Sequence, residues 1–340
     1  MNLKTLRVCA LPCLAGMPGL LTALALVLLL AGGCDSTEPE PPPWIHTPGP
    51  VAPVAFAHPA WHPGGRYIAA EHGDSLDANG DGHLDTLFGG IWLIDVQTGQ
   101  KKPLVAGDLP AWAPDGKRLA LVRAAQIYVV DVLDVEAARI DTSSLRPLTS
   151  EGRNFFPAWS PDGAWIAYDS DAQDPSAPYE VWIMRSDGSE KTNVSGYSSR
   201  MPHWSEDGQR LVHKAYLGMG ASEIAVIDTA GGEIERLTFD TNMDDHPSFS
   251  PNGEQIAFCS QPQQGLPAIW VMNRDGTRPR KVSPDTAYHF DWSPDGKHLV
   301  FLYHPGYKPN TLEIYPGSGE LWVMNTDGSD LRRLTYTTIR

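Results

Sequence analysis

The chain has 340 residues, a formal net charge of −15 at pH 7 and four cysteines. The excess of acidic residues argues against a protein that binds the phosphate backbone of nucleic acids, because like charges repel. The few cysteines argue against a small scaffold held together by disulfides.

Residues 1–33 have the features of a secretory signal. Lys4 and Arg7 are their only charged residues, and an apolar run covers 20–31. The run ends in LAGGC, with small residues before Cys34, which resembles the site where a bacterial signal peptidase cleaves and the cysteine sulfur takes a lipid. We therefore expect lipidation at Cys34. An ordinary secretory signal with an incidental cysteine is the alternative. Removal of residues 1–33 would change the formal charge to −17.

Residues 34–50 are rich in proline and carry no lysine or arginine. Such a segment favours an extended tether. We expect it to hold a monomeric domain, residues 51–340, off a membrane of the bacterial cell envelope, facing the periplasm or the exterior. The lipid would be the only membrane contact.

A calcium loop is predicted at residues 77–85. Asp77, Asn79 and Asp81 stand at alternate positions, Gly82 allows a sharp turn, His83 offers a backbone carbonyl, and Asp85 offers a carboxylate or a bridging water. These hard oxygen ligands favour calcium as a structural cofactor. Position 12 of the loop is Phe88 where an EF-hand has glutamate, so the loop more closely resembles those inserted between strands of extracellular modules. An acidic turn without metal is the alternative.

A short sequence motif, which we call the repeated phrase, occurs six times at intervals of 43 to 51 residues. It consists of an aromatic residue followed by a turn that ends in glycine. The copies begin at Trp61, Trp112, Trp159, Trp204, Phe249 and Trp292. A period of this length indicates one supersecondary unit that is repeated and stacked. We expect the six aromatic residues to pack between neighbouring units.

The third copy illustrates the unit. Strands are expected at 156–160, 165–168, 180–184 and 191–194, and the turn Pro161-Asp162-Gly163 joins the first two. The other copies give second strands near 67–70, 118–122, 210–213, 255–258 and 298–303, and third strands near 90–95, 126–131, 223–228, 268–273 and 320–325. Four antiparallel strands in each repeat predict an all-β fold, a single six-bladed β-propeller.

The repeat resembles that of the TolB-type β-propeller family, in phrases such as WSPDG followed by an IWVMN strand and a closing Leu-Thr. The resemblance covers about 51–340. TolB carries a further domain before its propeller, so its partner contacts are not transferred to this chain. Many TolB-like propellers precede an α/β-hydrolase domain, and we expect none here because the sequence stops in the last strand of the sixth repeat.

Familiar catalytic motifs are absent. The sequence has no G-x-S-x-G, no H-E-x-x-H, no C-x-x-C and no phosphate-binding loop. Within the repeats Cys259 is the only cysteine, so it has no intramolecular disulfide partner, and we expect a buried apolar residue there.

One constellation of histidines stands out. Three residues before each repeated aromatic lie His58, Leu109, Phe156, Met201, His246 and His289. In a closed ring the fifth, sixth and first blades are neighbours, so the three histidines would converge in loops near one channel mouth, beside Asp244, Asp245 and Tyr288. Three imidazoles there could hold a transition metal. Unlinked loop histidines are the alternative.

Ligand binding is expected on the face that carries the loops between second and third strands, with Tyr307, Tyr315 and Trp44 adding aromatic surface. The leading hypothesis is a non-catalytic envelope protein that recognises another protein or a glycan. The alternative is a metal-dependent polysaccharide lyase, similar to oligogalacturonate lyases, or a hydrolase. Arg153 and Arg200 would then lie across the ring from the histidines.

Overall fold

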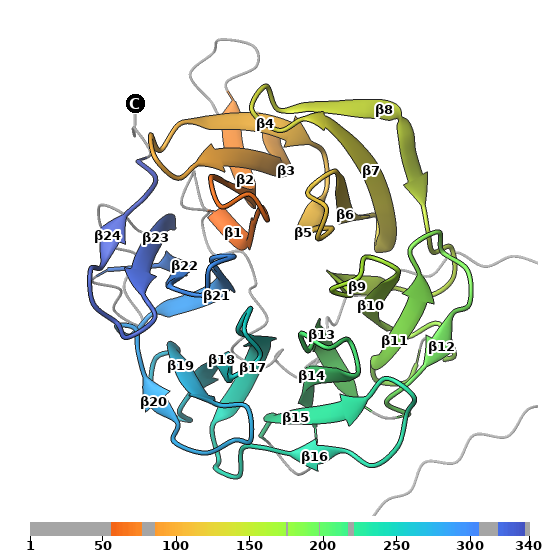
Figure 1. The fold of residues 1–340 in the computed structure, drawn as a ribbon, viewed down its shortest axis with the longest axis vertical. Coiled ribbons are helices and arrows are strands. Elements are labelled where there is room, and N and C mark those ends of the chain that lie inside the picture. Colours follow the sequence, from red (N-terminus) through yellow and green to blue (C-terminus); the bar gives the residue numbers. More distant parts are fainter. Residues whose placement is uncertain are drawn as a thin grey trace, which may run out of the picture. The chain divides into compact units, whose positions relative to one another are not determined.

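The computed structural model describes residues 56–76, 86–174, 176–196, 198–216, 221–305 and 319–336, with backbone only for 73–76 and 86–88. These residues form six four-stranded antiparallel sheets arranged around a central axis (Figure 1). In each sheet the four strands follow one another in chain order, from the innermost to the outermost. The prediction of a six-bladed, all-β propeller is confirmed.

The strands of the six blades are, in order, β1–β4 (Phe56–Trp61, Tyr67–Leu76, Thr86–Asp95, Lys101–Val105), β5–β8 (Asp108–Trp112, Arg118–Arg123, Gln126–Asp134, Arg139–Pro147), β9–β12 (Asn154–Trp159, Trp165–Ser170, Glu180–Arg185, Thr192–Asn193), β13–β16 (Ser199–Trp204, Arg210–Ala215, Glu223–Asp228, Glu235–Arg236), β17–β20 (Met243–Phe249, Gln255–Gln261, Ala268–Asn273, Arg280–Lys281) and β21–β24 (Ala287–Trp292, His298–Tyr303, Glu320–Asn325, Arg332–Arg333).

The repeated phrase forms the turn between the first two strands of a blade. In the third copy the Ser160 hydroxyl donates to the Asp162 carboxylate at 2.6 Å, and the Asp162 carboxylate accepts the Ala164 N–H at 2.9 Å. Gly163 has a φ of 67°, which glycine adopts without steric cost. The serine, aspartate and glycine of the phrase are therefore turn residues.

The repeated aromatic residues pack between blades. All six are between 4% and 8% exposed. The indole N–H of Trp159, Trp204 and Trp292 donates to a carbonyl of the preceding blade, at 3.1, 2.9 and 3.3 Å respectively. Each of these residues thus contributes apolar burial and a directional bond to the same interface.

The ring closes between β1 and β21 without exchanging strands. The Trp61 backbone N–H donates to the Asp291 carboxylate at 2.6 Å, and the Phe56 N–H donates to the Gly319 carbonyl at 2.8 Å. A core cluster that includes Phe56 and Trp61 from the first blade and Val300 from the sixth fills the same seam. Closure therefore depends on side-chain packing and on these cross-seam hydrogen bonds.

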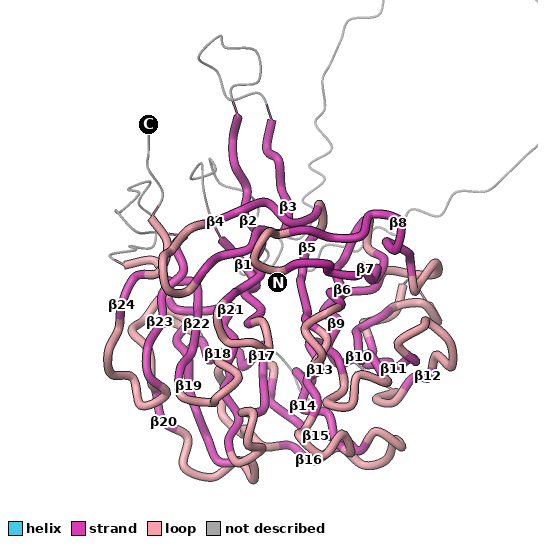
Figure 2. The backbone as a smooth tube through the Cα atoms, turned by 45° about the horizontal axis from the view of Figure 1, so that its top comes forward, coloured by secondary structure: helices cyan, strands magenta, loops and turns pink. Residues whose placement is uncertain are grey.

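The β2–β3 hairpin stands out from the ring (Figure 2). Its strands pair continuously from Tyr67↔Asp95 to Leu76↔Thr86, so each is longer than the sequence predicts. The predicted calcium loop, Asp77 to Asp85, lies outside the described residues, as do Cys34, the tether, Trp44, Tyr307 and Tyr315. Their roles stay predictions. Among the described residues, no helix is long and apolar enough to span a membrane.

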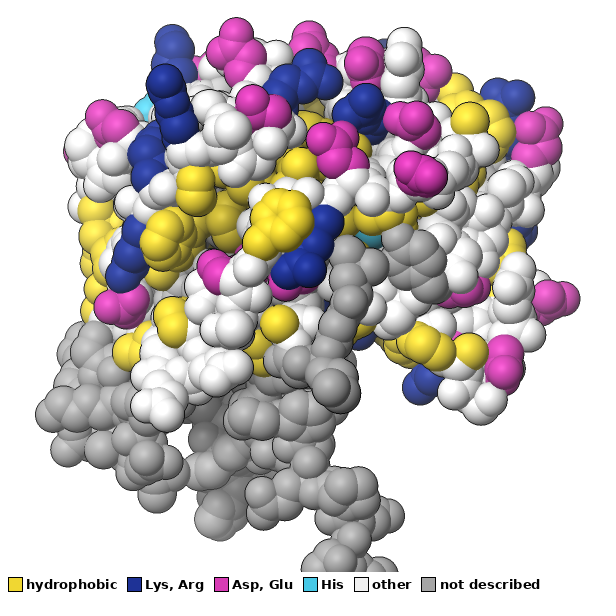
Figure 3. All heavy atoms as spheres, turned by 90° about the horizontal axis from the view of Figure 1, so that it is seen from below, with side chains coloured by type: hydrophobic (Ala, Val, Ile, Leu, Met, Phe, Trp, Pro, Cys, Tyr) yellow, Lys and Arg dark blue, Asp and Glu magenta, His cyan; other side chains and the backbone are white. Residues whose placement is uncertain are grey.

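The outer side of the ring mixes apolar and charged side chains (Figure 3). Phe239, Tyr336 and Leu133 are the most exposed large hydrophobic residues in the described part of the chain, at 73%, 70% and 58%. Guanidinium groups cover two of these rings, with Arg236 4.8 Å from the Phe239 ring centre and Arg333 4.5 Å from the Tyr336 ring centre.

Candidate functional site

All six innermost strands share a β-bulge that turns one side chain out of its regular register. The bulged residues have φ values between 44° and 57°, in the left-handed region that only glycine adopts without cost, and they are His58, Leu109, Phe156, Met201, His246 and His289. Five of them precede a proline, and the last precedes Phe290. These six residues, which we call the bulge ring, all line the central cavity. The histidines therefore lie within strands and not in the loops predicted from the sequence.

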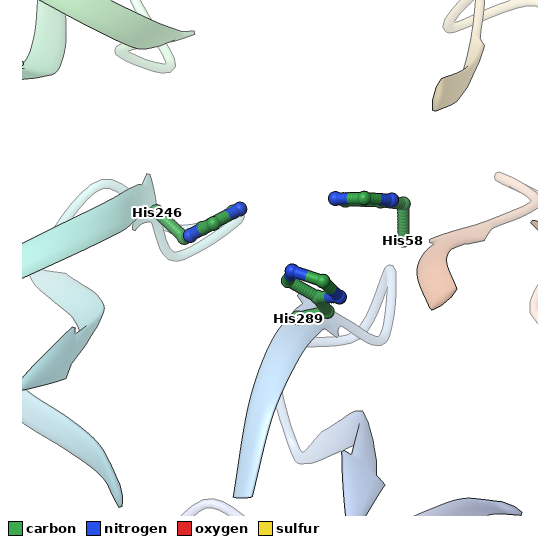
Figure 4. A group of neighbouring side chains, drawn as sticks. All are labelled: His58, His246 and His289. Atoms are coloured by element: carbon green, nitrogen blue, oxygen red, sulfur yellow. The ribbon is translucent and has the colours of Figure 1, made fainter. Parts of the chain in front are cut away.

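The three histidines of the bulge ring come together, as their equivalent positions predicted (Figure 4). One nitrogen of each lies within 4.8 Å of the others. Ring centres are 3.9 Å apart for His58 and His289, 4.9 Å for His246 and His289, and 5.9 Å for His58 and His246. Phe156, from across the ring, presents an edge contact to both His58 and His246 at 5.8 and 5.7 Å.

Two of these histidines are oriented by carboxylates. His58 Nδ1 lies 2.8 Å from Glu71 Oε1, and His246 Nδ1 lies 2.9 Å from Asp245 Oδ1. Glu71 also accepts the Leu109 N–H at 2.8 Å, so it connects the bulges of two neighbouring blades. A carboxylate on one imidazole nitrogen fixes the ring and leaves the other nitrogen for a ligand.

The electrostatics of these pairs favour the ionised form of both carboxylates. Burial by itself would raise the pKa of Glu71 and of Asp245, but attraction to His58 and to His246, with their hydrogen bonds, holds each pKa below its ordinary value. Burial lowers the pKa of His246, against the opposing effect of Asp245. His246 is therefore neutral at pH 7, the form that coordinates a metal.

The donor set fits a transition-metal ion. His246 Nε2 is buried and has no hydrogen-bond partner, so it is available as a ligand. Nitrogens that share a tetrahedral ion at about 2.0–2.1 Å are about 3.4 Å apart. The three histidine nitrogens lie within 4.8 Å of one another. Rotation of the side chains that shortens these distances to about 3.4 Å would complete the site. Three protein ligands leave at least one position open for another molecule.

The bulge ring lies at one end of a cavity of about 490 Å³ that runs along the channel to the turns between first and second strands. Those turns are at the opposite end of each blade from the β2–β3 hairpin, because successive strands are antiparallel. The cavity therefore extends from the bulge ring toward the face opposite the β2–β3 hairpin.

Besides Glu206 in the turn after β13, two further titratable residues line this cavity, each directly before a repeated aromatic. Burial lowers the pKa of His203 to about 4, so its neutral Nδ1 accepts the Phe249 N–H at 3.3 Å. Burial raises the pKa of Asp291 to about 7, although the backbone N–H groups of Trp61 and Trp292, at 2.6 and 2.9 Å, oppose the rise.

The two aspartates predicted beside the histidines do not line this cavity. Asp244 is 1% exposed, and burial raises the pKa of its carboxyl to about 7. Asp245 lies behind His246, and its second oxygen is 3.6 Å from the amine of buried Lys214. Cys259 is buried, as expected, with its thiol pKa raised by burial.

The predicted arginines are held by buried carboxylates. Arg200 donates to Asp169 at 2.5 Å, and Arg153 donates to Asp171 at 2.6 Å. Arg200 also lies 5.5 Å from the ring centre of Phe156, so it approaches the bulge ring from the fourth blade.

Sequence reasoning missed Glu71, His203 and Asp291. Glu71 has a recognisable signal, a carboxylate that directly follows the apolar run from Tyr67 to Ala70 on the second strand. His203 and Asp291 occupy the position before the aromatic, where three other blades have alanine. A comparison of the residue directly before each repeated aromatic, across the six repeats, would have identified His203 and Asp291.

A family model described as the TolB β-propeller domain matches residues 180–315. Residues 180–315 of this chain therefore carry TolB-type β-propeller repeats. An uncharacterised protein of Agrobacterium fabrum is 30% identical over 186 residues, which cover 49% of this chain and 60% of the relative. An uncharacterised peptidase of Bacillus subtilis, YuxL, is 27% identical over 187 residues, which cover 52% of this chain and 26% of the peptidase. The matches thus span less than two thirds of either relative.

Solved structures share the fold of this propeller. TolB from Acinetobacter baumannii superposes with a TM-score of 0.57 at 18% identity, covering 81% of this chain and 61% of TolB. An oligogalacturonate lyase in complex with manganese superposes with a TM-score of 0.53 at 11% identity, covering 83% of this chain and 78% of the lyase. Binding proteins and enzymes are both built on this architecture, so the fold does not decide between them.

Proposed function

We propose that this TolB-type propeller is a binding module that holds its ligand in the central channel, through a divalent transition-metal ion on His58, His246 and His289. The observation that supports this most directly is the convergence of three histidine nitrogens within 4.8 Å. The carboxylates of Glu71 and Asp245 behind two of the imidazoles support it further, because such partners orient metal-binding histidines. An envelope protein or a glycan is the proposed partner.

The backbone of the bulge ring also supports a functional role. Non-glycine residues in the left-handed region cost about 1–3 kcal/mol each. Six such residues, at equivalent positions, all place their side chains around one channel. Only three of the six are histidine, and these come from adjacent blades, so the repeat alone does not require imidazole there.

Metal binding is tested on the full chain after treatment with a chelator. We expect Zn²⁺ or Mn²⁺ to bind with one ion per histidine cluster, and to raise the melting temperature by about 5–10 °C at a hundredfold excess over the Kd. His246→Ala should abolish the shift, because it removes an unpartnered nitrogen of the cluster. Calorimetric titration and thermal melts measure both effects.

His298→Ala is the matched control, since His298 lies on β22 outside the cavity lining and should leave the shift intact. If neither Zn²⁺ nor Mn²⁺ changes the melting temperature of the unmodified protein, the proposed metal centre is refuted.

The second candidate function is the metal-dependent lyase. Its support is the shared fold with a manganese-bound oligogalacturonate lyase and the open coordination position that three histidines leave. An activity assay on the same metal-loaded sample distinguishes the binding module from the lyase. A binding module should release no unsaturated product from oligogalacturonate, whereas turnover that disappears in His246→Ala would establish the enzyme instead.

The proposed setting is the bacterial envelope, with Cys34 as the lipid anchor. The small residues before Cys34 and the tether that follows support this setting. Acyl chains contribute about 0.8 kcal/mol for each buried CH₂, so a multiply acylated protein stays on the membrane. Cys34→Ala should abolish incorporation of labelled fatty acid and release the protein into the soluble fraction. Retention of the variant in membranes would refute the anchor.

A further inference from the structure

In the described part of the chain, the central cavity is lined by acidic residues without matching lysine or arginine residues. Its lining includes two acidic residues, Glu206 and Asp291, and no lysine or arginine among the described residues. Glu206 is exposed in the turn after β13, where every other blade has proline, so it marks the outer rim. Asp291 is on β21, two residues beyond His289, and lies deeper along the channel. Carboxyl groups are therefore present at both levels of the cavity, and that of Asp291 ionises as the pH rises through about 7.

Asp291 differs in chemistry from the alanine that three other blades have directly before the repeated aromatic. Its carboxylate accepts two backbone N–H groups, at 2.6 and 2.9 Å, but no lysine or arginine of the described chain lies within ion-pair distance. A carboxylate has about four acceptor positions, so two remain for another donor. The equivalent residues Ala60, Ala111 and Ala158 offer no such acceptor, whereas Asp291 places one at the seam where the ring closes.

Aromatic residues make up much of the remaining wall. Phe156 and Phe290, which are half-buried, line the cavity, together with the buried Phe249 and the repeated tryptophans. Aromatic faces attract cations because their π-systems are negative, and the attraction grows when water is excluded. A carboxylate among aromatic side chains is thus complementary to an organic cation and unfavourable to an anion.

We propose that the ligand of this channel carries a protonated amine that pairs with Asp291 against the aromatic wall. The inference builds on the proposed function only in taking the channel as the ligand site, because the amine would bind whether or not the histidines hold a metal. It also defines the chemical class: a cationic or amine-bearing ligand is favoured, and an acidic sugar such as oligogalacturonate is disfavoured by Glu206 and Asp291.

The test uses three probes of one shape and different charge, benzylammonium, benzyl alcohol and benzoate, at about pH 8 with a chelator present. Binding to the full chain is followed by tryptophan fluorescence. We expect saturable binding of benzylammonium, at least about tenfold weaker binding of benzyl alcohol, and no binding of benzoate. Asp291→Asn should reduce benzylammonium to the affinity of benzyl alcohol, because the charge is removed and the shape is kept.

Glu233→Gln is the matched control, since it removes one exposed acid from an outer hairpin of the fourth blade and should change nothing. Benzylammonium binding is measured with a chelator present and so does not depend on a metal ion, which separates this inference from the metal proposal. The inference is overturned if benzylammonium does not saturate, if benzyl alcohol or benzoate binds equally well, or if folded Asp291→Asn keeps full affinity. The comparison of probes on the unmodified protein decides the matter even if that variant fails to fold.

Discussion

Replacing Trp204 by alanine is expected to lower the free energy of unfolding by about 3–5 kcal/mol. Trp204 is 4% exposed, and it packs in a core cluster with Ile183 of the third blade and Leu211 of the fourth. Its indole also donates to the Ala158 carbonyl at 2.9 Å. Truncation would leave a cavity at an interface between blades. Denaturant unfolding measures the loss.

Two further variants define the mechanism of that loss. Trp204→Phe should cost only about 1–2 kcal/mol, because the fifth blade packs with Phe249 at the equivalent position and only the indole bond and some volume are lost. Phe239→Ala, at a side chain 73% exposed, should stay within about 0.5 kcal/mol. A Trp204→Ala cost no larger than that of Phe239→Ala would show that the repeated aromatic does not hold the blades together.

Replacing Arg200 by methionine is expected to destabilise the protein by about 3 kcal/mol at pH 8, and by much less at pH 4. Asp169 is fully buried and pairs with Arg200 at 2.5 Å. Burial already raises the Asp169 pKa to about 6, against the effect of Arg200. Without the guanidinium the pKa rises further, so ionisation costs more.

The sign of the pH dependence follows from that raised pKa. The stabilising contribution of protonated Asp169 is complete below its ordinary pKa of 3.8 and is lost as pH rises through about 6. The Arg200→Met penalty should therefore appear mainly above that range, in denaturant unfolding measured at both pH values. Arg210→Met, which removes partners from two exposed carboxylates, should cost less than about 1 kcal/mol at either pH. An Arg200→Met penalty that is equal at pH 4 and pH 8 would contradict the explanation.

Much of the candidate site was predictable because a repeat gives equivalent positions. Counting back three residues from each aromatic identified His58, His246 and His289, and ring closure made their blades neighbours. The same count could not show that these residues adopt left-handed φ values within strands. That conformation depends on the bulge, which is a property of pairing between two strands and not of local residue preference.

The sequence by itself determined the number of blades, the four-stranded unit and the residues of each turn, because these depend on local preferences repeated six times. Only the tertiary structure decided which groups meet. Glu71 reaches both His58 and the Leu109 N–H, and Asp291 joins the sixth blade to the first, although each pair is distant in the chain. It also decided that the cavity extends from the bulge ring toward the first turns. The physical reason is that channel shape, burial and the resulting pKa values arise from the packing of six blades around one axis, which no single repeat encodes.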